Sequence, residues 1–117
     1  MADVDPSVAL SIVVPARDEQ DNVRPLVEQV EATVRGRVQG VGFRHHTRRT
    51  ARDLGLTGFV RNEPGGTVTV VAEGPQSVLE ELLAALQDGP RSAVVHDVET
   101  MWTTARDAFG DFSVAYH

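Results

Sequence analysis

The hydrophobic residues from position 30 onward change their spacing several times, and the order of these changes limits the folds that the chain can adopt. Between residues 30 and 38, apolar and polar residues alternate one by one, which predicts a half-buried strand. Residues 44–54 instead carry apolar side chains at the spacing of a helix face, and Gly55 is a natural helix stop. Residues 56–62 and 67–73 then predict two strands joined by the turn EPGG.

The second half of the chain continues this pattern. A second helix is predicted to begin with Pro75, because proline suits the first helical position, and to end at the sequence DGP. Its apolar face consists of Val78, Leu79, Leu82, Leu83 and Leu86. A strand follows over residues 92–102, and a short last strand within residues 111–117. This βαββαβ order predicts an α+β, ferredoxin-like sandwich in which two helices cover one face of an antiparallel sheet.

Residues 1–29 form a different unit. The sequence ALSIVVP predicts a short buried strand, and ARDEQDN predicts a loop. Val23, Leu26, Val27 and Val30 share one face of a helix, which we expect to end near Gln29. We therefore expect two parts, a strand–helix arm over residues 1–29 and a complete domain over residues 30–117.

Composition excludes several classes of protein. The net charge is −6, which argues against broad binding to nucleic acid, and the absence of cysteine excludes disulfides and thiolate metal sites. No apolar run approaches the roughly 20 residues that span a bilayer, and the acidic start is unlike a secretory signal. We expect a soluble, cytoplasmic protein with no membrane partner.

The sequence GRVQGVGFR, residues 36–44, places a glycine-rich loop between the first predicted strand and the first predicted helix. Backbone N–H groups before a helix can converge on an anion, and glycine permits the backbone angles that this requires. Arg44 at the helix start supplies a guanidinium that grips phosphate or carboxylate with two hydrogen bonds. The pattern predicts an anion site, and the alternative is a tight turn followed by a surface arginine.

These segments together resemble the acylphosphatase family. The resemblance rests on the loop GRVQGVGFR, the helix end LGLTG, the strand end VRN, the turn GGTV, the step AEGP and the terminal FSVAY. It covers about residues 30–117. It implies hydrolysis of acyl phosphates to a carboxylate and inorganic phosphate, with neither a metal nor another cofactor.

The resemblance also assigns roles to residues. Arg44 and Asn62 are the implied catalytic pair, with Arg44 neutralising the phosphoryl oxygens and Asn62 orienting the attacking water. The implied phosphate cradle consists of the backbone amides of Gln39, Gly40, Val41, Gly42, Phe43 and Arg44. Glu63 departs from what an anion site favours, because it adds a negative charge directly after Asn62.

Other residues have plainer interpretations. His45, His46, His96 and His117 invite a metal site, but adjacent helical residues point about 100° apart, so we expect none. Arg48, Arg49 and Arg52 fit a solvated helix face. Asn62 is alternatively a simple turn residue. A non-catalytic phosphate-binding module and an interaction domain remain the rival functions.

Residues 8–32 resemble the opening of a family 2 glycosyltransferase of the dolichol-phosphate mannosyltransferase kind. The rest of that fold has no room in this chain, so we do not expect glycosyl transfer. We expect a monomer, with dimerisation through the N-terminal arm as the alternative.

Overall fold

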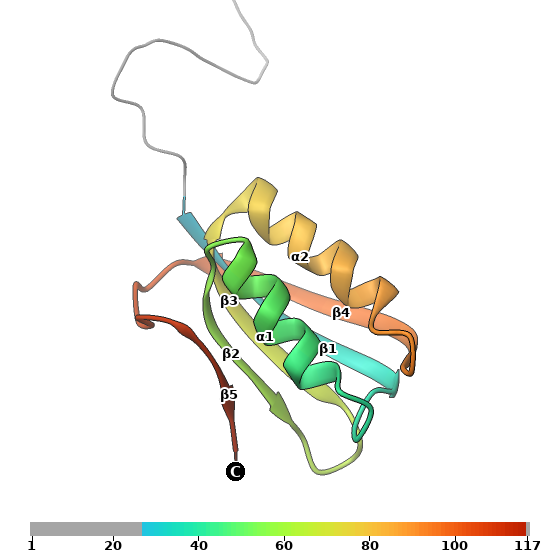
Figure 1. The fold of residues 1–117 in the computed structure, drawn as a ribbon. Coiled ribbons are helices and arrows are strands. Elements are labelled where there is room, and N and C mark those ends of the chain that lie inside the picture. The colour runs from blue at the N-terminus through green and yellow to red at the C-terminus, as the bar shows by residue number, and fades with distance from the viewer. Residues whose placement is uncertain (1–26, 117) are drawn as a thin grey trace, which may run out of the picture.

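The computed structural model describes residues 27–116 as a single layer of strands covered by two helices (Figure 1). The predicted strand over ALSIVVP, most of the predicted arm and His117 lie outside these described residues. The elements follow in the order β1 (Val27–Arg37), α1 (Phe43–Asp53), β2 (Thr57–Asn62), β3 (Val68–Pro75), α2 (Gln76–Asp88), β4 (Val94–Thr104) and β5 (Phe112–Ala115).

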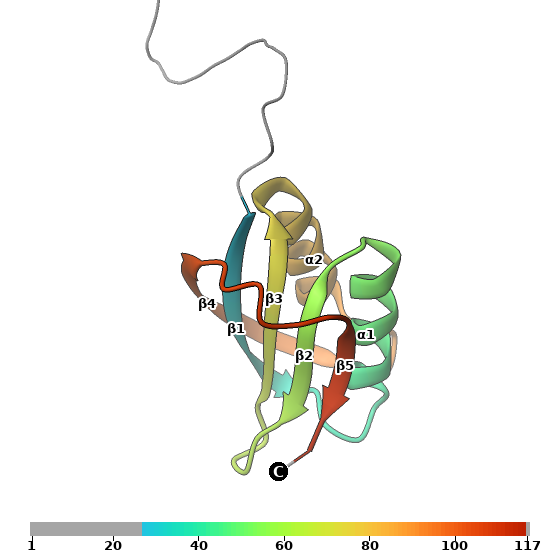
Figure 2. The same cartoon turned by 90° about the vertical axis from the view of Figure 1, so that its left-hand side faces the viewer.

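The strands form one sheet in the order β4-β1-β3-β2-β5, with both helices on the same face. This confirms the predicted ferredoxin-like architecture. The sheet is mixed rather than wholly antiparallel, because β5 runs parallel to β2, with Gly58 opposite Phe112. Figure 2 shows the cause: the chain leaves β4 and crosses the uncovered face of the sheet before it enters β5 beside β2.

The first strand begins earlier than the sequence pattern predicts. Val27, Glu28 and Gln29 were expected to end a helix, but they pair with β3, where Val27 lies opposite Pro75. Glu28 and Gln29 also pair with β4 on the other side. The prediction of helix at these three residues is therefore wrong, because ladder hydrogen bonds to two neighbours outweigh a weak local preference.

The hydrophobic core fills the space between the sheet and the helices. The fully buried side chains come from every strand but β4 and from both helices, and the largest are Phe43, Phe112, Leu79, Leu82 and Leu86. Trp102 on β4 packs against this core from the edge of the sheet, as expected for a strand residue. Each such side chain contributes roughly 1.5–3 kcal/mol by leaving water.

The uncovered face of the sheet is crossed by residues 105–111, which we call the crossing segment (Figure 2). Glu73 of β3 is only 4% exposed and accepts hydrogen bonds from the Arg106 backbone N–H at 2.8 Å and from Gln29 Nε2 at 3.0 Å. Phe109 packs edge-to-face on Phe59, with ring centroids 5.8 Å apart. A buried carboxylate and an aromatic pair thus hold the crossing segment on the sheet.

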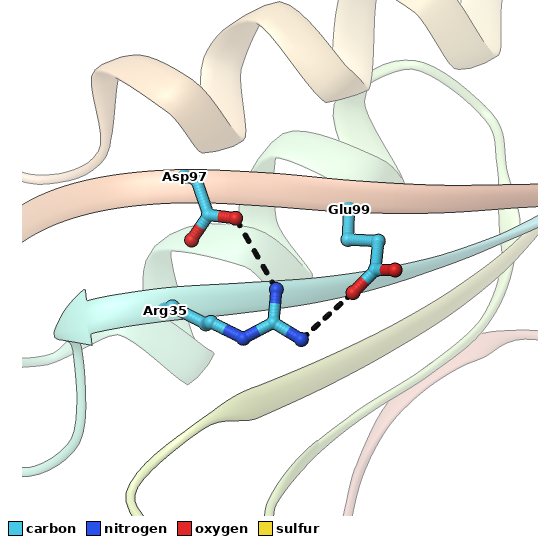
Figure 3. Close-up of polar contacts among 3 residues, drawn as sticks. All are labelled: Arg35, Asp97 and Glu99. Atoms are coloured by element: carbon cyan, nitrogen blue, oxygen red, sulfur yellow. Dashed lines mark hydrogen bonds and ion pairs between the residues drawn. The ribbon is translucent and has the colours of Figure 1, made fainter.

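The outer strand β4 carries charges on the same uncovered face. Arg35 of β1 bridges Asp97 at 3.2 Å and Glu99 at 2.7 Å (Figure 3). The hydrogen bond that Arg35 donates to Glu99, supported by the charges of both carboxylates, raises the pKa of Arg35 above its usual value. All three side chains are exposed, so the cluster adds little stability.

Neither helix in the described part of the chain has the length and apolar character needed to cross a bilayer.

Gly58 provides a test of the sheet packing. Its φ is +142°, and a Cβ there would overlap the carbonyl oxygen of Val71 on β3. We expect Gly58→Ala to destabilise the protein by about 3 kcal/mol, because backbone in the middle of a sheet has nowhere to move. Chemical denaturation measures this change.

Gly66→Ala is the matched control, since Gly66 also has a positive φ, of +96°, but has open space around it. It should cost only about 1 kcal/mol. An equal loss of unfolding free energy in the two variants would show that the backbone angle alone, and not contact with Val71, makes glycine necessary at position 58.

Candidate functional site

The glycine-rich loop leaves the end of β1 and leads directly into α1. Val38 before it and Phe43 after it are both 1% exposed, so each end is fixed in the core. Gly40 and Gly42 have φ values of +73° and +78°, and a left-handed backbone at Gly42 immediately precedes the helix. Successive N–H groups in such a loop point toward a common concave space, where an anion gains their partial positive charges.

Two side chains hold the loop in place from either side. Gln39 Nε2 donates to the backbone carbonyls of Glu63 and Thr67, each at 2.8 Å, which joins the loop to the turn between β2 and β3. On the other side, Ser92 Oγ donates to the carbonyl of Val41 at 2.8 Å. The Gln39 side chain and the Val41 carbonyl therefore serve the loop structurally, which leaves only their N–H groups for an anion.

Arg44 lies in a cleft of ≈ 520 Å³ between the loop, α1 and the last strand. Its guanidinium carbon lies 5.3 Å from the ring centroid of Tyr116, a cation–π contact that positions the charge. The lining residues are Val38, Gly40, Gly42, Phe43, Arg44, His45, Arg48, Arg52, Ser113, Val114 and Tyr116. None of them is a carboxylate, so the cleft favours a negatively charged ligand.

Asn62 ends β2 and pairs with Val68 across the β2–β3 hairpin. Its Oδ1 is buried and has no hydrogen-bond partner among the described residues. Such an oxygen is costly unless a ligand or a water donates to it. Asn62 itself does not line the cleft, but the bond from Gln39 to Glu63, the next residue, links the end of β2 to the glycine loop.

Glu63 was expected to disturb an anion site. In the structure, its carboxylate forms an ion pair with Arg61 at 2.9 Å, and Arg61 in turn lies over the ring of Phe59. Part of the negative charge of Glu63 is thus balanced by an arginine near the end of β2.

The two adjacent histidines point in different directions, as helix geometry predicts. His45 is exposed and lines the cleft, whereas His46 does not, and its Nε2 is buried without a hydrogen-bond partner in the described part of the chain. Across residues 27–116, no three His, Cys, Asp or Glu side chains gather as a metal site would require.

The arginines of α1 correct the sequence analysis in part. Arg49 is exposed and outside the cleft, as expected for a solvated face. Arg48 and Arg52, assigned to that same face, line the cleft with Arg44; Arg52 is exposed as expected, whereas Arg48 is half-buried. Their spacing of four and eight residues from Arg44 was the signal, because it places all three on one side of a helix.

Comparison with known proteins agrees with this geometry. A family model described as Acylphosphatase matches residues 30–114. An acylphosphatase of Salinibacter ruber is 53% identical over 87 residues, which make up 74% of this chain and 92% of that relative.

Two solved acylphosphatase structures have the same fold. The protein from Bacillus subtilis superposes with a TM-score of 0.74 at 34% identity, covering 76% of this chain and 99% of its own. The protein from Coxiella burnetii gives 0.73 at 37% identity, covering 77% of this chain and 94% of its own.

Gln39 provides a test of how the loop is held. We expect Gln39→Leu to weaken binding of inorganic phosphate about fivefold and to destabilise the fold by about 1–2 kcal/mol, because it removes two hydrogen bonds to backbone carbonyls. Calorimetric titration with phosphate and chemical denaturation measure the two effects.

Gln76→Leu is the control, because Gln76 makes a single exposed hydrogen bond to Glu80 on α2. It should change neither quantity appreciably. A destabilised Gln39→Leu protein with undiminished phosphate affinity would show that the loop does not need this attachment to bind an anion.

Proposed function

This chain belongs to the acylphosphatase family, and we propose that its Arg44 and Asn62 carry out the reaction of that family. The reaction is hydrolysis of the carboxyl–phosphate bond of an acyl phosphate, which yields a carboxylate and inorganic phosphate. The observation that carries the assignment is the cleft in which Arg44 lies beside two positive-φ glycines, with no carboxylate among the described residues that line it.

The phosphoryl group is expected to rest on the loop. N–H groups from residues 39–44 would donate to its oxygens, and the Arg44 guanidinium would neutralise the charge on them. This charge is spread over the oxygens as the phosphoryl group moves between the leaving carboxylate and the water. The contact with Tyr116 limits the conformations of Arg44 before substrate arrives, which reduces the entropy lost on binding.

Asn62 is expected to hold the attacking water. Its unpartnered Oδ1 would accept a hydrogen bond from that water, which leaves a lone pair of the water oxygen directed at phosphorus. The new bond joins the water oxygen to phosphorus, and the bond from phosphorus to the acyl oxygen breaks. An amide is too weak a base to take the proton, so a phosphoryl oxygen of the substrate accepts it.

A binding module without catalysis is the rival function, and the position of Asn62 outside the lining of the cleft favours it. The two alternatives differ in what Asn62 does. A module that only binds phosphate has no use for a water-orienting amide. It would hydrolyse no substrate with or without Asn62, and loss of Asn62 would not change its affinity for phosphate.

Hydrolysis of benzoyl phosphate in the presence of EDTA tests both roles. We expect Arg44→Ala to lower kcat/KM by at least about 10³-fold, because it removes the main positive charge that neutralises the phosphoryl oxygens. Asn62→Ala should lower kcat by about 10²-fold but change inhibition by inorganic phosphate by less than roughly threefold.

Arg49→Ala is the matched control, since it removes an arginine of α1 that lies outside the cleft, and it should keep wild-type kinetics. A folded wild-type protein that fails to hydrolyse benzoyl phosphate would refute the catalytic assignment. Activity that depends on added metal would refute the proposed independence from cofactors.

We also propose that residues 1–26 are dispensable for this activity. The family match begins at residue 30, but β1 pairs from Val27 onward, so a truncation must start at Val27 to preserve the sheet. The truncated protein should keep its kcat/KM within about twofold, since the described core and cleft remain complete. A larger loss would show that the N-terminal residues contribute to the site, and size-exclusion chromatography of both forms would test whether they cause dimerisation.

We further propose that the protein is monomeric and cytoplasmic, and that residues 8–32 resemble the opening of a glycosyltransferase without providing its activity. These proposals rest on the sequence patterns alone.

A further inference from the structure

Three arginines form a column along one side of α1. Arg44, Arg48 and Arg52 are each separated by four residues, and all three line the same cleft. Successive members of the column are offset by about 6 Å along the helix axis. The cleft therefore extends its positive charge well beyond the position of Arg44, in a chain whose net charge is −6.

The three guanidinium groups differ in their partners. Arg44 stacks on Tyr116 at the glycine loop. Arg52 is occupied at the far end, where it donates to Asp111 at 2.6 Å and to the carbonyl of Phe112 at 3.0 Å. Arg52 thereby fastens the start of β5 to α1.

Arg48 lies between them and is different. It is half-buried, it lines the cleft, and it makes no hydrogen bond or ion pair with any residue in the described part of the chain. Within residues 27–116, no carboxylate lines the cleft to balance it. Ser113 of β5 is exposed and also lines the cleft.

We propose that Arg48 forms a second anion subsite, which selects acyl phosphates whose acyl group carries a negative charge of its own. This inference rests on the proposed function, because it places the phosphoryl group at Arg44 and the glycine loop. The acyl group then extends along α1, and a carboxylate several bonds away from the phosphoryl group reaches the Arg48 guanidinium. Arg48 is a specificity residue for the acyl group and touches none of the reacting atoms.

Two synthetic substrates of equal size test this proposal. 3-Carboxybenzoyl phosphate carries a second anion on a rigid ring, and 3-carbamoylbenzoyl phosphate replaces that carboxylate with a neutral amide. We expect the wild-type protein to prefer the carboxylate substrate by about tenfold in kcat/KM, the size of one partly exposed charged hydrogen bond. Because the preference depends on charge, it should shrink when salt is raised from about 0.05 to 0.5 M.

The variants assign the preference to one residue. Arg48→Gln should reduce the ratio of the two kcat/KM values to between one and two, and Arg48→Lys should restore a ratio of about three to five, since lysine keeps the charge. Arg49→Gln changes the charge of α1 equally, outside the cleft, and should keep the tenfold ratio.

Several outcomes would overturn the subsite. One is a ratio of the two kcat/KM values near one in the wild-type protein. Another is an equal loss of kcat/KM on both substrates in Arg48→Gln. A third is an equal fall of the ratio in Arg49→Gln, which would indicate a general electrostatic effect of the charge on α1. The failure of the proposed function looks different, because the wild-type protein would then hydrolyse neither substrate.

Discussion

Strand β1 is hydrogen-bonded along both edges, to β3 from Val27 and to β4 from Glu28, and the rest of the molecule is positioned by these two ladders. The ladder with β3 fixes the register of the β2–β3 hairpin, in which Asn62 is the last residue of β2. The ladder with β4 fixes the register of the outer strand. The glycine loop begins where β1 ends, so its starting point and direction are set by the most constrained strand of the sheet. Val30, Ala32 and Val34 of β1 are fully buried in the core, and α2 packs against this strand.

The site joins the glycine loop and the helix that follows it to a strand that is distant in sequence. The loop supplies N–H groups, α1 supplies its arginines, and β5 supplies Ser113, Val114 and Tyr116. Their positions are held by small numbers of specific bonds: Gln39 to the β2–β3 turn, Ser92 to the loop, and Arg52 to the start of β5. Rigid attachment of this kind allows a few donors to act on an anion without first being reorganised.

Much of this was predictable from the sequence. The changes of hydrophobic period indicated the order of helices and strands, and the resemblance to a family pointed to Arg44 and Asn62. What the sequence patterns missed were contacts between distant segments. The parallel pairing of β5 with β2 depends on the crossing segment, which the buried carboxylate of Glu73 holds in place. Glu73 and its partner Arg106 are 33 residues apart, and the local spacing of hydrophobic residues does not predict contacts over such a separation. The cleft that Arg48 and Arg52 share with Arg44 was missed for the same reason, because β5 forms its other wall.

The charged outer strand described with Figure 3 affects how copies of this chain meet one another. β4 leaves one edge of its backbone unpaired within the described residues, and such edges are where unrelated strands add to a sheet. Asp97 and Glu99 stand on this strand with one shared arginine between them, which leaves an excess of negative charge. A second β4 that approached in the same register would bring like charges face to face, at a cost that screening by salt reduces. The cluster contributes little to folding, and its effect is to slow edge-to-edge growth of aggregates in concentrated solution.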